Sequence, residues 1–426
     1  MYLCIDLGTT SFKSAVFDEN LNKLSSASRL VKFLSASSKS EISATEILGA
    51  FKEIISGALS SAHITPEKIT SIGITSQAQT FAIVQGNVFK THFISWMDKR
   101  ATETCDKISP EPIFNDFSRH ASFDKLYPNL QLCFMKHISE IIDNNSEILP
   151  LPSYLIKLLT GKNITDNNIA AMSGFYSIPE KKWRKELLQY CGISEKQMPK
   201  LANIGENIEP TSVESLRNFG LPKGIPVFSC GNDQTAGAYG ANIHKNNKIL
   251  ITLGTAQVAY VCESKISKPI EGVFRGPCPG GIYYKAVADS YGGAMINIAL
   301  DVIPEFKDFS TFFKLAEKGR EKKGKVTVKF DEKTNQISRD GDVLDIEAYA
   351  YSVLDLITER MIVLIKKLNC NKNEILCSGG GSKNKIWIEL MEEKLNRKIR
   401  VVNFDSLLGV ARMSKKNYRQ EASAKV

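Results

Sequence analysis

The sequence is poor in the residues that build metal centres and disulfide frameworks. Only 5 of its 426 residues are histidine, and none stands at metal-ligand spacing from another histidine or a cysteine, so a zinc site is not expected. Its 9 cysteines are scattered, odd in number and without a Cys-x-x-Cys pair. This pattern indicates free thiols in a reducing compartment, and we therefore predict a cytoplasmic protein.

Long apolar runs and concentrated charge are also absent. No uninterrupted stretch approaches the roughly 20 apolar residues that cross a bilayer. Asp6 interrupts the apolar stretch at the N-terminus and no basic region precedes it, so neither a signal peptide nor a membrane partner is expected. The net charge of +9 comes from lysines spread along the chain, with small clusters at Lys322–Lys325 and Lys415–Lys416. This predicts a solvated basic surface, with a mild benefit for anionic substrates and no nucleic-acid partner.

What is present is the composition of a globular protein, with 43% hydrophobic and 24% charged residues. A chain of 426 residues is too long for one ordinary hydrophobic core, and two domains are expected. Ser43 and Glu46 have the capping-box pattern and predict the start of a helix with one apolar face. Strands are expected over residues 2–6, 12–17, 24–33 and 69–75. Together these patterns favour a mixed α/β layer structure.

The later parts of the chain continue this pattern. The region from Glu111 to Asn218 is predicted to be helix-rich, and a hairpin is expected over residues 248–261. A long amphipathic helix is expected over residues 346–368, followed by a strand over residues 374–377. The polar tail over residues 415–426 is predicted to be frayed or disordered. Prolines mark the expected breaks in the helix-rich region at Pro150, Pro152, Pro179 and Pro210.

One short pattern occurs twice. The segments Leu7–Thr9 and Leu253–Thr255 both read Leu-Gly-Thr, and each stands between two predicted strands. The repeat predicts a duplicated domain with two hairpins that face one another. Turns of this kind present backbone N–H groups into a concavity and bind phosphate oxygens well, with hydroxyl groups as further donors.

Charged residues flank the first of these turns. Asp6 directly precedes it, although a phosphate pocket should repel an acid. A Mg²⁺ ion would resolve this conflict, because it prefers oxygen ligands and usually keeps several waters. Lys13, across the same hairpin, could neutralise charge that develops on a transferred phosphoryl group. An ordinary hairpin with a surface aspartate is the alternative that these residues alone leave open.

Five segments in one order resemble the landmarks of a known family. Asp6–Lys13 resembles the first phosphate motif of the FGGY carbohydrate kinases, which belong to the actin, Hsp70 and sugar-kinase superfamily, and Ile251–Ala256 resembles the second. Cys377–Asn384 is similar to the family's adenosine motif, and Trp96–Arg100 and Leu158–Gly161 resemble two further landmarks. The resemblance implies an α/β fold of two actin-like, ribonuclease H-like domains, each a mixed β-sheet flanked by helices, with a cleft between them.

The resemblance also implies domain and site assignments. Residues 1–243 would form an N-terminal domain with the substrate site, the catalytic base and the first phosphate motif. Residues 244–426 would form a nucleotide-binding domain that is abbreviated at its end. The implied cofactors are ATP and Mg²⁺, with Asp6 at the metal. The implied ATP contacts are Gly8, Thr9, Thr10, Ser11, Lys13, Gly254 and Thr255 at the phosphates, and Gly380, Gly381 and Asn384 at the adenosine.

Asp233 is the best candidate for a general base. It follows a predicted strand end within Gly231–Gly237, before a helix of small residues, and the resemblance places the family's catalytic aspartate here. A carboxylate in a closed cleft can take the proton of a hydroxyl that attacks the γ-phosphate. The alternative is an aspartate that only caps the following helix.

The segment Ser76–Phe81 resembles the family's substrate loop. Gln79 stands where relatives carry a charged or imidazole side chain, and its amide can both donate and accept, which suits a polyol. Trp96 would offer an apolar wall to a carbon backbone, or would simply pack in a core. Asp98 and Arg100 are expected to pair with each other or with neighbours. The implied substrate contacts are Gln77, Gln79, Trp96, Asp233 and Gln234.

One segment departs from the family pattern. Asp405–Arg412 is an abbreviated counterpart of the family's closing segment and lacks the usual glutamate. This departure puts in question how tightly the nucleotide binds and how fully the second domain closes. It does not affect the catalytic residues of the first domain.

These residues predict an ATP-dependent kinase that phosphorylates a hydroxyl of a polyol or of a sugar, such as a xylulose- or ribulose-like ketose. A non-catalytic nucleotide- or sugar-binding sensor is the alternative; the shortened C-terminus favours it, and the presence of Asp6 and Asp233 disfavours it. A chaperone- or filament-type ATPase would have no reason to carry the Gln77–Phe81 loop. The expected partner is a small sugar or polyol, and a homodimer is left open.

Overall fold

The structure, a computed structural model, describes residues 1–424 except 246, 307, 343, 371–373 and 404. These residues form two compact units, of which the first contains residues 1–242, 263–284 and 405–424. The second unit contains residues 243–262 and 285–403. The sequence predicts a single division after residue 243. Two later stretches belong instead to the first unit, because side chains such as Phe274 and Val410 pack in its cores.

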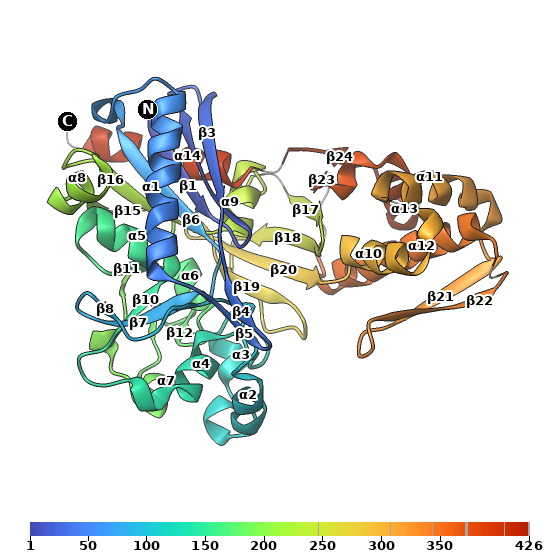
Figure 1. Cartoon of the computed structure of the whole chain (residues 1–426), viewed down its shortest axis with the longest axis horizontal. Coiled ribbons are helices and arrows are strands. Elements are labelled where there is room, and N and C mark those ends of the chain that lie inside the picture. The colour runs from blue at the N-terminus through green and yellow to red at the C-terminus, as the bar shows by residue number, and fades with distance from the viewer. Residues whose placement is uncertain (246, 307, 343, 371–373, 404, 425–426) are drawn as a thin grey trace. The chain divides into compact units, whose positions relative to one another are not determined.

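A mixed β-sheet forms the centre of the first unit, with the strand order β15-β16-β6-β1-β2-β3 (Figure 1). Strand β1 is antiparallel to β2 and parallel to β6, and β6 is in turn parallel to β16. The strands are β1 (Tyr2–Leu7), β2 (Ser11–Phe17), β3 (Lys23–Leu30), β6 (Ser71–Ser76), β15 (Asn207–Pro210) and β16 (Pro226–Asn232). Because three neighbouring strands run in the same direction, their carboxyl ends meet at one edge of the sheet.

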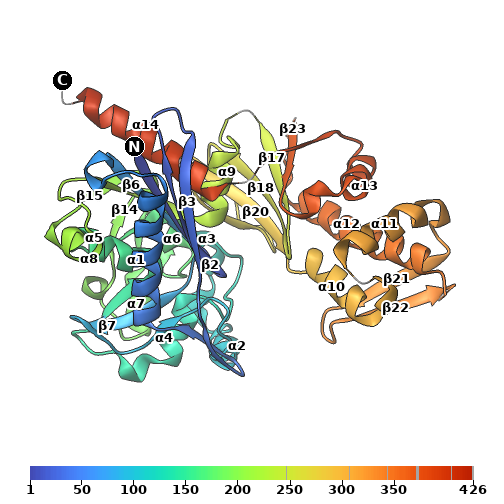
Figure 2. The same cartoon turned by 45° about the horizontal axis from the view of Figure 1, so that its top comes forward.

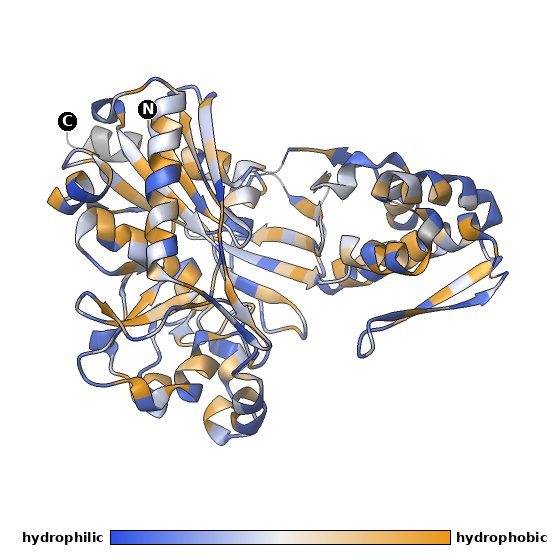
Figure 3. Ribbon diagram, viewed as in Figure 1, coloured by the Kyte–Doolittle hydropathy of each residue, from blue (hydrophilic) through white to orange (hydrophobic). Residues whose placement is uncertain are grey.

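Both faces of this sheet are buried. Successive side chains of β1 point to opposite faces, and all six residues of the strand are buried. Leu3 and Ile5 pack with α1 (Ala44–Ser61), whose Ile47, Phe51 and Ile54 are buried. In Figure 3 hydrophobic and hydrophilic bands alternate along this helix. The Ser43 hydroxyl caps α1 as predicted. The reciprocal half of the capping box is replaced, since the Glu46 carboxylate accepts hydrogen bonds from Arg29 and the Lys32 N–H.

The C-terminal helix covers the other face. Helix α14 (Ser406–Ala424) contacts β1, β6 and α9 (Asp233–Gly240), and Figure 2 shows it beside α9. Its buried Leu407, Val410 and Met413 pack with Tyr2 and Cys4 of β1. The prediction of a frayed or disordered tail is therefore wrong for the backbone of residues 415–424, which continues this helix, while residues 425–426 lie outside the described residues. The apolar residues that precede the polar stretch anchor the helix to the sheet.

The rest of the first unit packs around a second core of buried aromatic and aliphatic residues that includes Phe81, Phe134 and Trp183. The region from Glu111 to Asn218 contains short strands as well as helices, so the prediction of a helix-rich region is only partly right. Pro152 lies in the first turn of α5 and starts that helix, as proline does well, and does not break one. None of the helices in the described part of the chain is long and apolar enough to cross a membrane.

The remaining elements of the first unit are short. One sheet contains β4 (Leu34–Ala36), β5 (Lys39–Ile42), β7 (Phe81–Gln85), β8 (Val88–Phe89), β9 (Phe93–Ile94) and β10 (Glu147–Pro150). Two strand pairs are β11 (Ile164–Asp166) with β14 (Lys200–Ala202), and β12 (Tyr176–Ser177) with β13 (Lys182–Trp183). The helices are α2 (Thr102–Ile108), α3 (Phe117–His120), α4 (Gln131–His137), α5 (Leu151–Thr160), α6 (Asn167–Ala171), α7 (Lys185–Tyr190) and α8 (Val213–Phe219).

Another mixed sheet, whose strands β17, β18, β23 and β24 form the centre of the second unit, has the strand order β19-β20-β18-β17-β23-β24; β19 lies within residues 263–284 of the first unit. The strands of this sheet are β17 (Lys248–Leu253), β18 (Gln257–Glu263), β19 (Phe274–Pro277), β20 (Tyr283–Asp289), β23 (Glu374–Ser378) and β24 (Ile399–Val401). A separate hairpin contains β21 (Val326–Asp331) and β22 (Gln336–Gly341). The helices are α10 (Gly293–Val302), α11 (Phe309–Gly319), α12 (Ile346–Lys367) and α13 (Lys385–Leu395). The predicted hairpin, long helix and strand of this region are confirmed.

The two central sheets repeat one pairing scheme. Strand β17 is antiparallel to β18 and parallel to β23, and β24 continues the sheet in parallel. The sheet of the first unit has the same scheme in β1, β2, β6 and β16. The repeated Leu-Gly-Thr segments therefore occupy the same turn of the same topology.

Candidate active site

The first Gly-Thr turn connects β1 and β2. In this hairpin Asp6 is paired with Lys13 and Leu7 with Phe12. The Asp6 carboxyl is buried, and its Oδ2 accepts a hydrogen bond of 2.6 Å from the Ser406 hydroxyl. Burial raises the pKa of Asp6, and the Ser406 hydrogen bond and the charge of Lys13 oppose this rise. Its Oδ1 is buried without a hydrogen-bond partner among the described residues.

Asp233 lies where β16 ends and α9 begins. The Asn232 side chain caps this helix, because its Oδ1 accepts a hydrogen bond of 2.8 Å from the Thr235 N–H. Asn232, and not Asp233, is therefore the N-cap residue of α9. Burial and the negative charge of Asp6 raise the pKa of Asp233 to about 7, and its Oδ1 accepts a hydrogen bond from the Gln234 N–H. Both carboxyl groups stand at the carboxyl edge of the first sheet, since β1 and β16 flank β6 in parallel.

The predicted substrate loop follows β6 at the same edge. The Thr9 hydroxyl donates to Gln77 Oε1 at 3.1 Å and accepts from the Trp96 indole N–H at 2.9 Å. Trp96 is 38% exposed, so the alternative of simple core packing is wrong. These contacts bring the first phosphate turn, the substrate loop and the tryptophan together.

Gln79 lies buried in a left-handed backbone conformation, with a φ of 67°. Its Oε1 accepts a hydrogen bond from Asn129 Nδ2 at 3.2 Å, and its Nε2 is 3.5 Å from the Met172 carbonyl oxygen. Asn232 Nδ2 contacts the sulfur of the same Met172 at 2.9 Å. Met172 therefore joins the substrate loop to Asn232, directly before Asp233. Asn129 holds the Gln79 side chain in place. Sequence reasoning missed Met172 and Asn129, because neither lies in a recognisable motif.

Asp98 and Arg100 pair with each other as expected. The Arg100 guanidinium donates to both Asp98 oxygens, at 3.0 and 2.7 Å, and to Glu41 at 2.5 Å. The Ser40 N–H donates to Asp98 as well. Burial disfavours the charged carboxylate, but these hydrogen bonds outweigh it and hold the pKa of Asp98 below its usual value. This pair fixes the segment that follows Trp96.

The second Gly-Thr turn connects β17 and β18 in the second unit. The Gly293 N–H donates to the Gly254 carbonyl at 2.8 Å, and the Ala294 N–H donates to the Thr255 carbonyl at 3.0 Å. A Cβ on Gly293 would lie 2.9 Å from the Gly254 oxygen, so only glycine allows this approach. The start of α10 therefore holds the turn through backbone contacts.

The glycine run after β23 lies in the same unit. Gly379 has a φ of +91°, and a Cβ there would lie 2.3 Å from the Leu253 carbonyl oxygen beside the second turn. Gly381 packs as closely on Trp387, whereas a Cβ on Gly380 would meet nothing within 4 Å. Asn384 donates to the Gly381 carbonyl at 3.3 Å. The open side of the run is therefore at Gly380.

Each unit thus assembles a different part of the predicted site. The first unit joins Asp6, Lys13, Thr9, Gln77, Gln79, Trp96 and Asp233 at the edge of one sheet, with Gly8, Thr10, Ser11 and Gln234 beside them. The second unit joins Gly254 and Thr255 to Gly379–Gly381 through Leu253. Among the described residues no cluster of three His, Cys, Asp or Glu side chains could hold a metal ion.

Residues 1–240 match the model of the N-terminal domain of the FGGY family of carbohydrate kinases. The chain belongs to this family. It is 24% identical to a xylulose kinase of Staphylococcus xylosus over 433 aligned positions, which cover 93% of this chain and 86% of that protein. It is 26% identical to a glycerol kinase of Lactobacillus acidophilus over 63% of this chain, and that match spans only 55% of the glycerol kinase.

A solved structure shares the fold over nearly the whole chain. The crystal structure of a Plasmodium falciparum glycerol kinase with ADP superposes on it with a TM-score of 0.86 at 18% identity. The superposition covers 99% of this chain and 90% of the glycerol kinase chain. The predicted α/β fold of the actin-like superfamily is thereby confirmed, and so is the prediction of a phosphotransferase that acts on an alcohol group, the class to which FGGY kinases belong. The cleft between the units, the roles of the two domain ranges, the homodimer and the cytoplasmic location stay predictions.

Proposed function

We propose that this FGGY kinase transfers the γ-phosphoryl group of ATP to a hydroxyl of a sugar or polyol, with Asp233 as the general base. The observation that carries this proposal is the pair of acids at one sheet edge. Burial and the charge of Asp6 raise the pKa of Asp233 to about 7. A carboxyl group that titrates near neutral pH is suited to take a proton during turnover and to release it afterwards.

In the proposed reaction the substrate hydroxyl oxygen attacks the γ-phosphorus. Its proton passes to the Asp233 carboxylate while the bond between the γ-phosphorus and the bridging oxygen breaks, and ADP leaves with the electron pair. Lys13, which is exposed beside the first turn, offsets negative charge on the transferred group. Exclusion of water from the site suppresses hydrolysis of ATP.

The residues of the first turn suit Mg²⁺. The buried Oδ1 of Asp6 has no hydrogen-bond partner among the described residues, and a carboxylate oxygen is a ligand that Mg²⁺ prefers. Asp6 would hold the ion together with phosphate oxygens and water. When bound, Mg²⁺ neutralises charge on the phosphates. The lack of a ready-made cage in the described residues agrees with a metal that depends on the nucleotide for ligands.

The nucleotide contacts are divided between the two units. In the first unit Gly8, Thr9, Thr10 and Ser11 offer backbone N–H and hydroxyl groups to the phosphates, and in the second unit Gly254 and Thr255 do the same. Gly380, Gly381 and Asn384 are the proposed adenosine contacts. The open space at Gly380 supports this role, because a nucleotide needs room at the backbone.

Gln77, Gln79, Trp96 and Gln234 are the proposed substrate contacts. The amides of Gln77 and Gln79 are held in place by hydrogen bonds, which orients them for hydroxyl groups. The exposed Trp96 offers a flat apolar face. Because relatives are a xylulose kinase and glycerol kinases, a ketose or a short polyol is the proposed substrate class.

The proposal is tested with purified protein, Mg²⁺ and ATP against xylulose, ribulose and glycerol, with ADP release as the readout. We expect one of these to stimulate turnover, and Asp233→Ala to lower it by roughly 10²–10⁴-fold while ATP still binds. Asp106→Ala, at an exposed position on α2, is the matched control and should leave turnover unchanged. ATP binding without any sugar-stimulated turnover would favour the sensor instead.

A further inference from the structure

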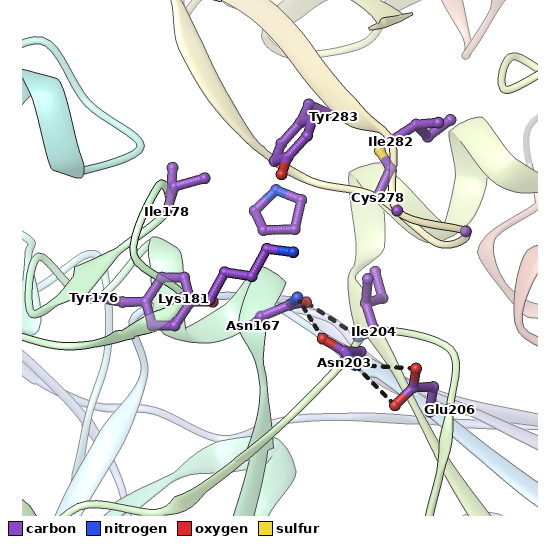
Figure 4. Close-up of a pocket in the computed structure, with 13 residues that line it drawn as sticks. Asn167, Tyr176, Ile178, Lys181, Asn203, Ile204, Glu206, Cys278, Ile282 and Tyr283 are labelled. Atoms are coloured by element: carbon purple, nitrogen blue, oxygen red, sulfur yellow. Dashed lines mark hydrogen bonds between the residues drawn. The ribbon is translucent and has the colours of Figure 1, made fainter. Parts of the chain in front are cut away.

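A small pocket in the first unit contains none of the residues proposed for the kinase reaction. Its volume is about 250 Å³. Four parts of the chain build it: the start of α6, the β14–β15 connection, the β12–β13 hairpin, and the turn between β19 and β20. Figure 4 shows Tyr283 on one side, Tyr176 and Lys181 on another, and a row formed by Asn167, Asn203 and Glu206 on a third.

The polar row is held in one arrangement by its own hydrogen bonds. Asn167 Nδ2 donates to Asn203 Oδ1 at 3.2 Å, and Asn203 Nδ2 donates to both Glu206 oxygens at 3.0 Å. Asn167 Oδ1 accepts from the Ile204 N–H at 3.0 Å. A carboxylate has lone pairs beyond these contacts and can accept further hydrogen bonds from hydroxyl groups. The site is therefore ordered before a ligand arrives, which lowers the entropic cost of binding.

The lining indicates the chemistry of the ligand. One ammonium group, on Lys181, and one carboxylate, on Glu206, balance each other, so the lining itself carries no net charge. Two tyrosine rings supply apolar faces with hydroxyl ends, and the amides both donate and accept. The volume is below the roughly 300–1,000 Å³ typical of sites for drug-sized ligands. The pocket is therefore too small for a nucleotide. A single uncharged polyhydroxylated molecule matches both the size and the groups.

The turn between β19 and β20 leaves room beside these groups. Gly280 and Gly281 line the pocket with φ values of +84° and +75°, and a Cβ on either would meet nothing within 4 Å. Their backbone therefore faces open space, and side chains there would be strained. Lys200 lies only in the adjoining groove, so an anion held by two lysines is the competing occupant to be tested.

The pocket shares a wall with the segment that carries Asp233. Ile204 lines the pocket, and its Cδ1 would lie 2.3 Å from a Cβ on Gly231, so it packs directly on the end of β16. Asn168 is fully buried beside it. Its Nδ2 donates to the carbonyl of the lining residue Pro277 at 2.7 Å, and its Oδ1 accepts from the Asn232 N–H at 2.9 Å. One side chain thus joins the pocket to the start of α9.

We propose that this pocket is a second binding site, for an uncharged polyhydroxylated molecule of monosaccharide size, and that its occupancy is transmitted through Asn168 to the Asn232–Asp233 segment. Binding to the pocket does not depend on the proposed kinase reaction. Only the consequence for turnover rests on the role proposed for Asp233.

Calorimetric titration of the full chain with xylitol and with glucose tests the site. We expect two classes of site for at least one probe, of which Asn203→Trp removes one by filling the rim of the pocket. Asn203 is exposed, so this variant should keep the fold. Lys181→Met should weaken the same class roughly tenfold, as loss of a hydrogen bond to a charged group does. The matched control is Lys182→Met, because Lys182 does not line the pocket, and it should change nothing.

A single class of site that is unaffected by Asn203→Trp and Lys181→Met would overturn the proposal. Binding of inorganic phosphate that Lys181→Met abolishes, with no such effect on either polyol, would also overturn it in favour of an anion site. Loss of ATP-dependent turnover leaves this titration interpretable, so failure of the kinase proposal and failure of the pocket are distinguishable.

Hydrogen exchange of the peptide covering residues 228–240 tests the transmission. The experiment uses Asp233→Ala, in which binding at the substrate site is weakened, with and without the probe that binds the pocket. We expect exchange at the start of α9 to slow at least about threefold on binding, as a gain of about 0.7 kcal/mol in local stability would produce. The change should be absent in the double variant with Asn203→Trp. Unchanged exchange at saturating probe would overturn the transmission.

Discussion

The two Gly-Thr turns have the same strand pairing but different chemistry. In the first unit, Asp6 precedes the turn and Lys13 is its cross-strand partner. At the corresponding positions of the second unit, Thr252 is paired with Val258. Both turns can offer backbone N–H groups to phosphates, but only the first has ionisable residues at this pair of strand positions. The charge and proton chemistry of the proposed reaction is therefore concentrated in the first unit.

The two turns are also held in place differently. The first is fixed by side chains, since the Thr9 hydroxyl bonds to Gln77 and Trp96. The second is fixed by backbone contacts from α10 and by the close approach of Gly379. Substitutions near the first turn should therefore change rate and pH dependence. Substitutions near the second should change stability or nucleotide affinity.

The largest expected difference is between Asp6→Asn and Thr252→Val, which alter the same position of the two hairpins. Asp6→Asn should lower kcat by roughly 10²–10³-fold, because it removes the charge proposed to hold Mg²⁺. Thr252→Val removes only a weak contact to Ser378 and should cost less than about tenfold. Steady-state kinetics at saturating Mg²⁺ measures both. Equal losses would mean that the two turns do not divide the chemistry.

The pH profile gives the next test. A general base acts when deprotonated, so kcat/KM should fall about tenfold per pH unit below the pKa of Asp233, which is about 7. Because the charge of Asp6 helps to raise that pKa, Asp6→Asn should move the acidic limb to lower pH. Thr252→Val should leave the limb in place. A limb that stays at the same pH in Asp6→Asn would show that the two acids are not coupled.

The backbone support of the second turn predicts a stability difference between neighbouring glycines. Gly379→Ala places a Cβ 2.3 Å from the Leu253 oxygen at a φ of +91° and should cost about 2–3 kcal/mol of unfolding free energy. Gly380→Ala meets nothing within 4 Å and should stay within about 0.5 kcal/mol of the parent. Urea unfolding measures both. If Gly380→Ala is fully stable but binds ATP more weakly, that result would support the proposal that the adenosine lies beside Gly380.

The smallest expected effect concerns the side-chain support of the first turn. Trp96→Phe keeps an aromatic face but loses the hydrogen bond to Thr9, so kcat/KM should fall about five-fold. Trp183→Phe is the matched control, since Trp183 is buried, donates to the Pro199 carbonyl and is none of the residues proposed for the kinase reaction. It should lower stability and leave kcat/KM unchanged. Identical kinetic losses in both variants would indicate a general effect of packing.

Sequence reasoning located the local features of both turns. The two hairpins, the cap at Ser43 and the pairing of Asp98 with Arg100 depend on residues close in the chain or on strong local propensities, and the structure confirms them. The cap of α9 could not be assigned from sequence, because Asn232 and Asp233 are both good capping residues and only the backbone geometry distinguishes them.

Tertiary contacts were beyond sequence reasoning. The hydrogen bonds from Asn129 to Gln79 and from Ser406 to Asp6 join residues 50 and 400 positions apart. No periodicity or motif marks such a pair in a single sequence. The last helix was missed for a related reason, since its polar end masked the buried Leu407 and Val410 that attach it to the sheet. The discontinuous first unit follows from the same contacts.

Helix α14 has a consequence for how the protein is made. A ribosome synthesises β1 first, but the helix that covers Tyr2 and Cys4 emerges only after the whole second unit. During translation one apolar face of the first sheet therefore stays uncovered until α14 has been synthesised. Contacts between residues this far apart in the sequence form slowly. Because Ser406 reaches Asp6 only then, the proposed metal-binding carboxylate is among the last groups of the nascent protein to be completed.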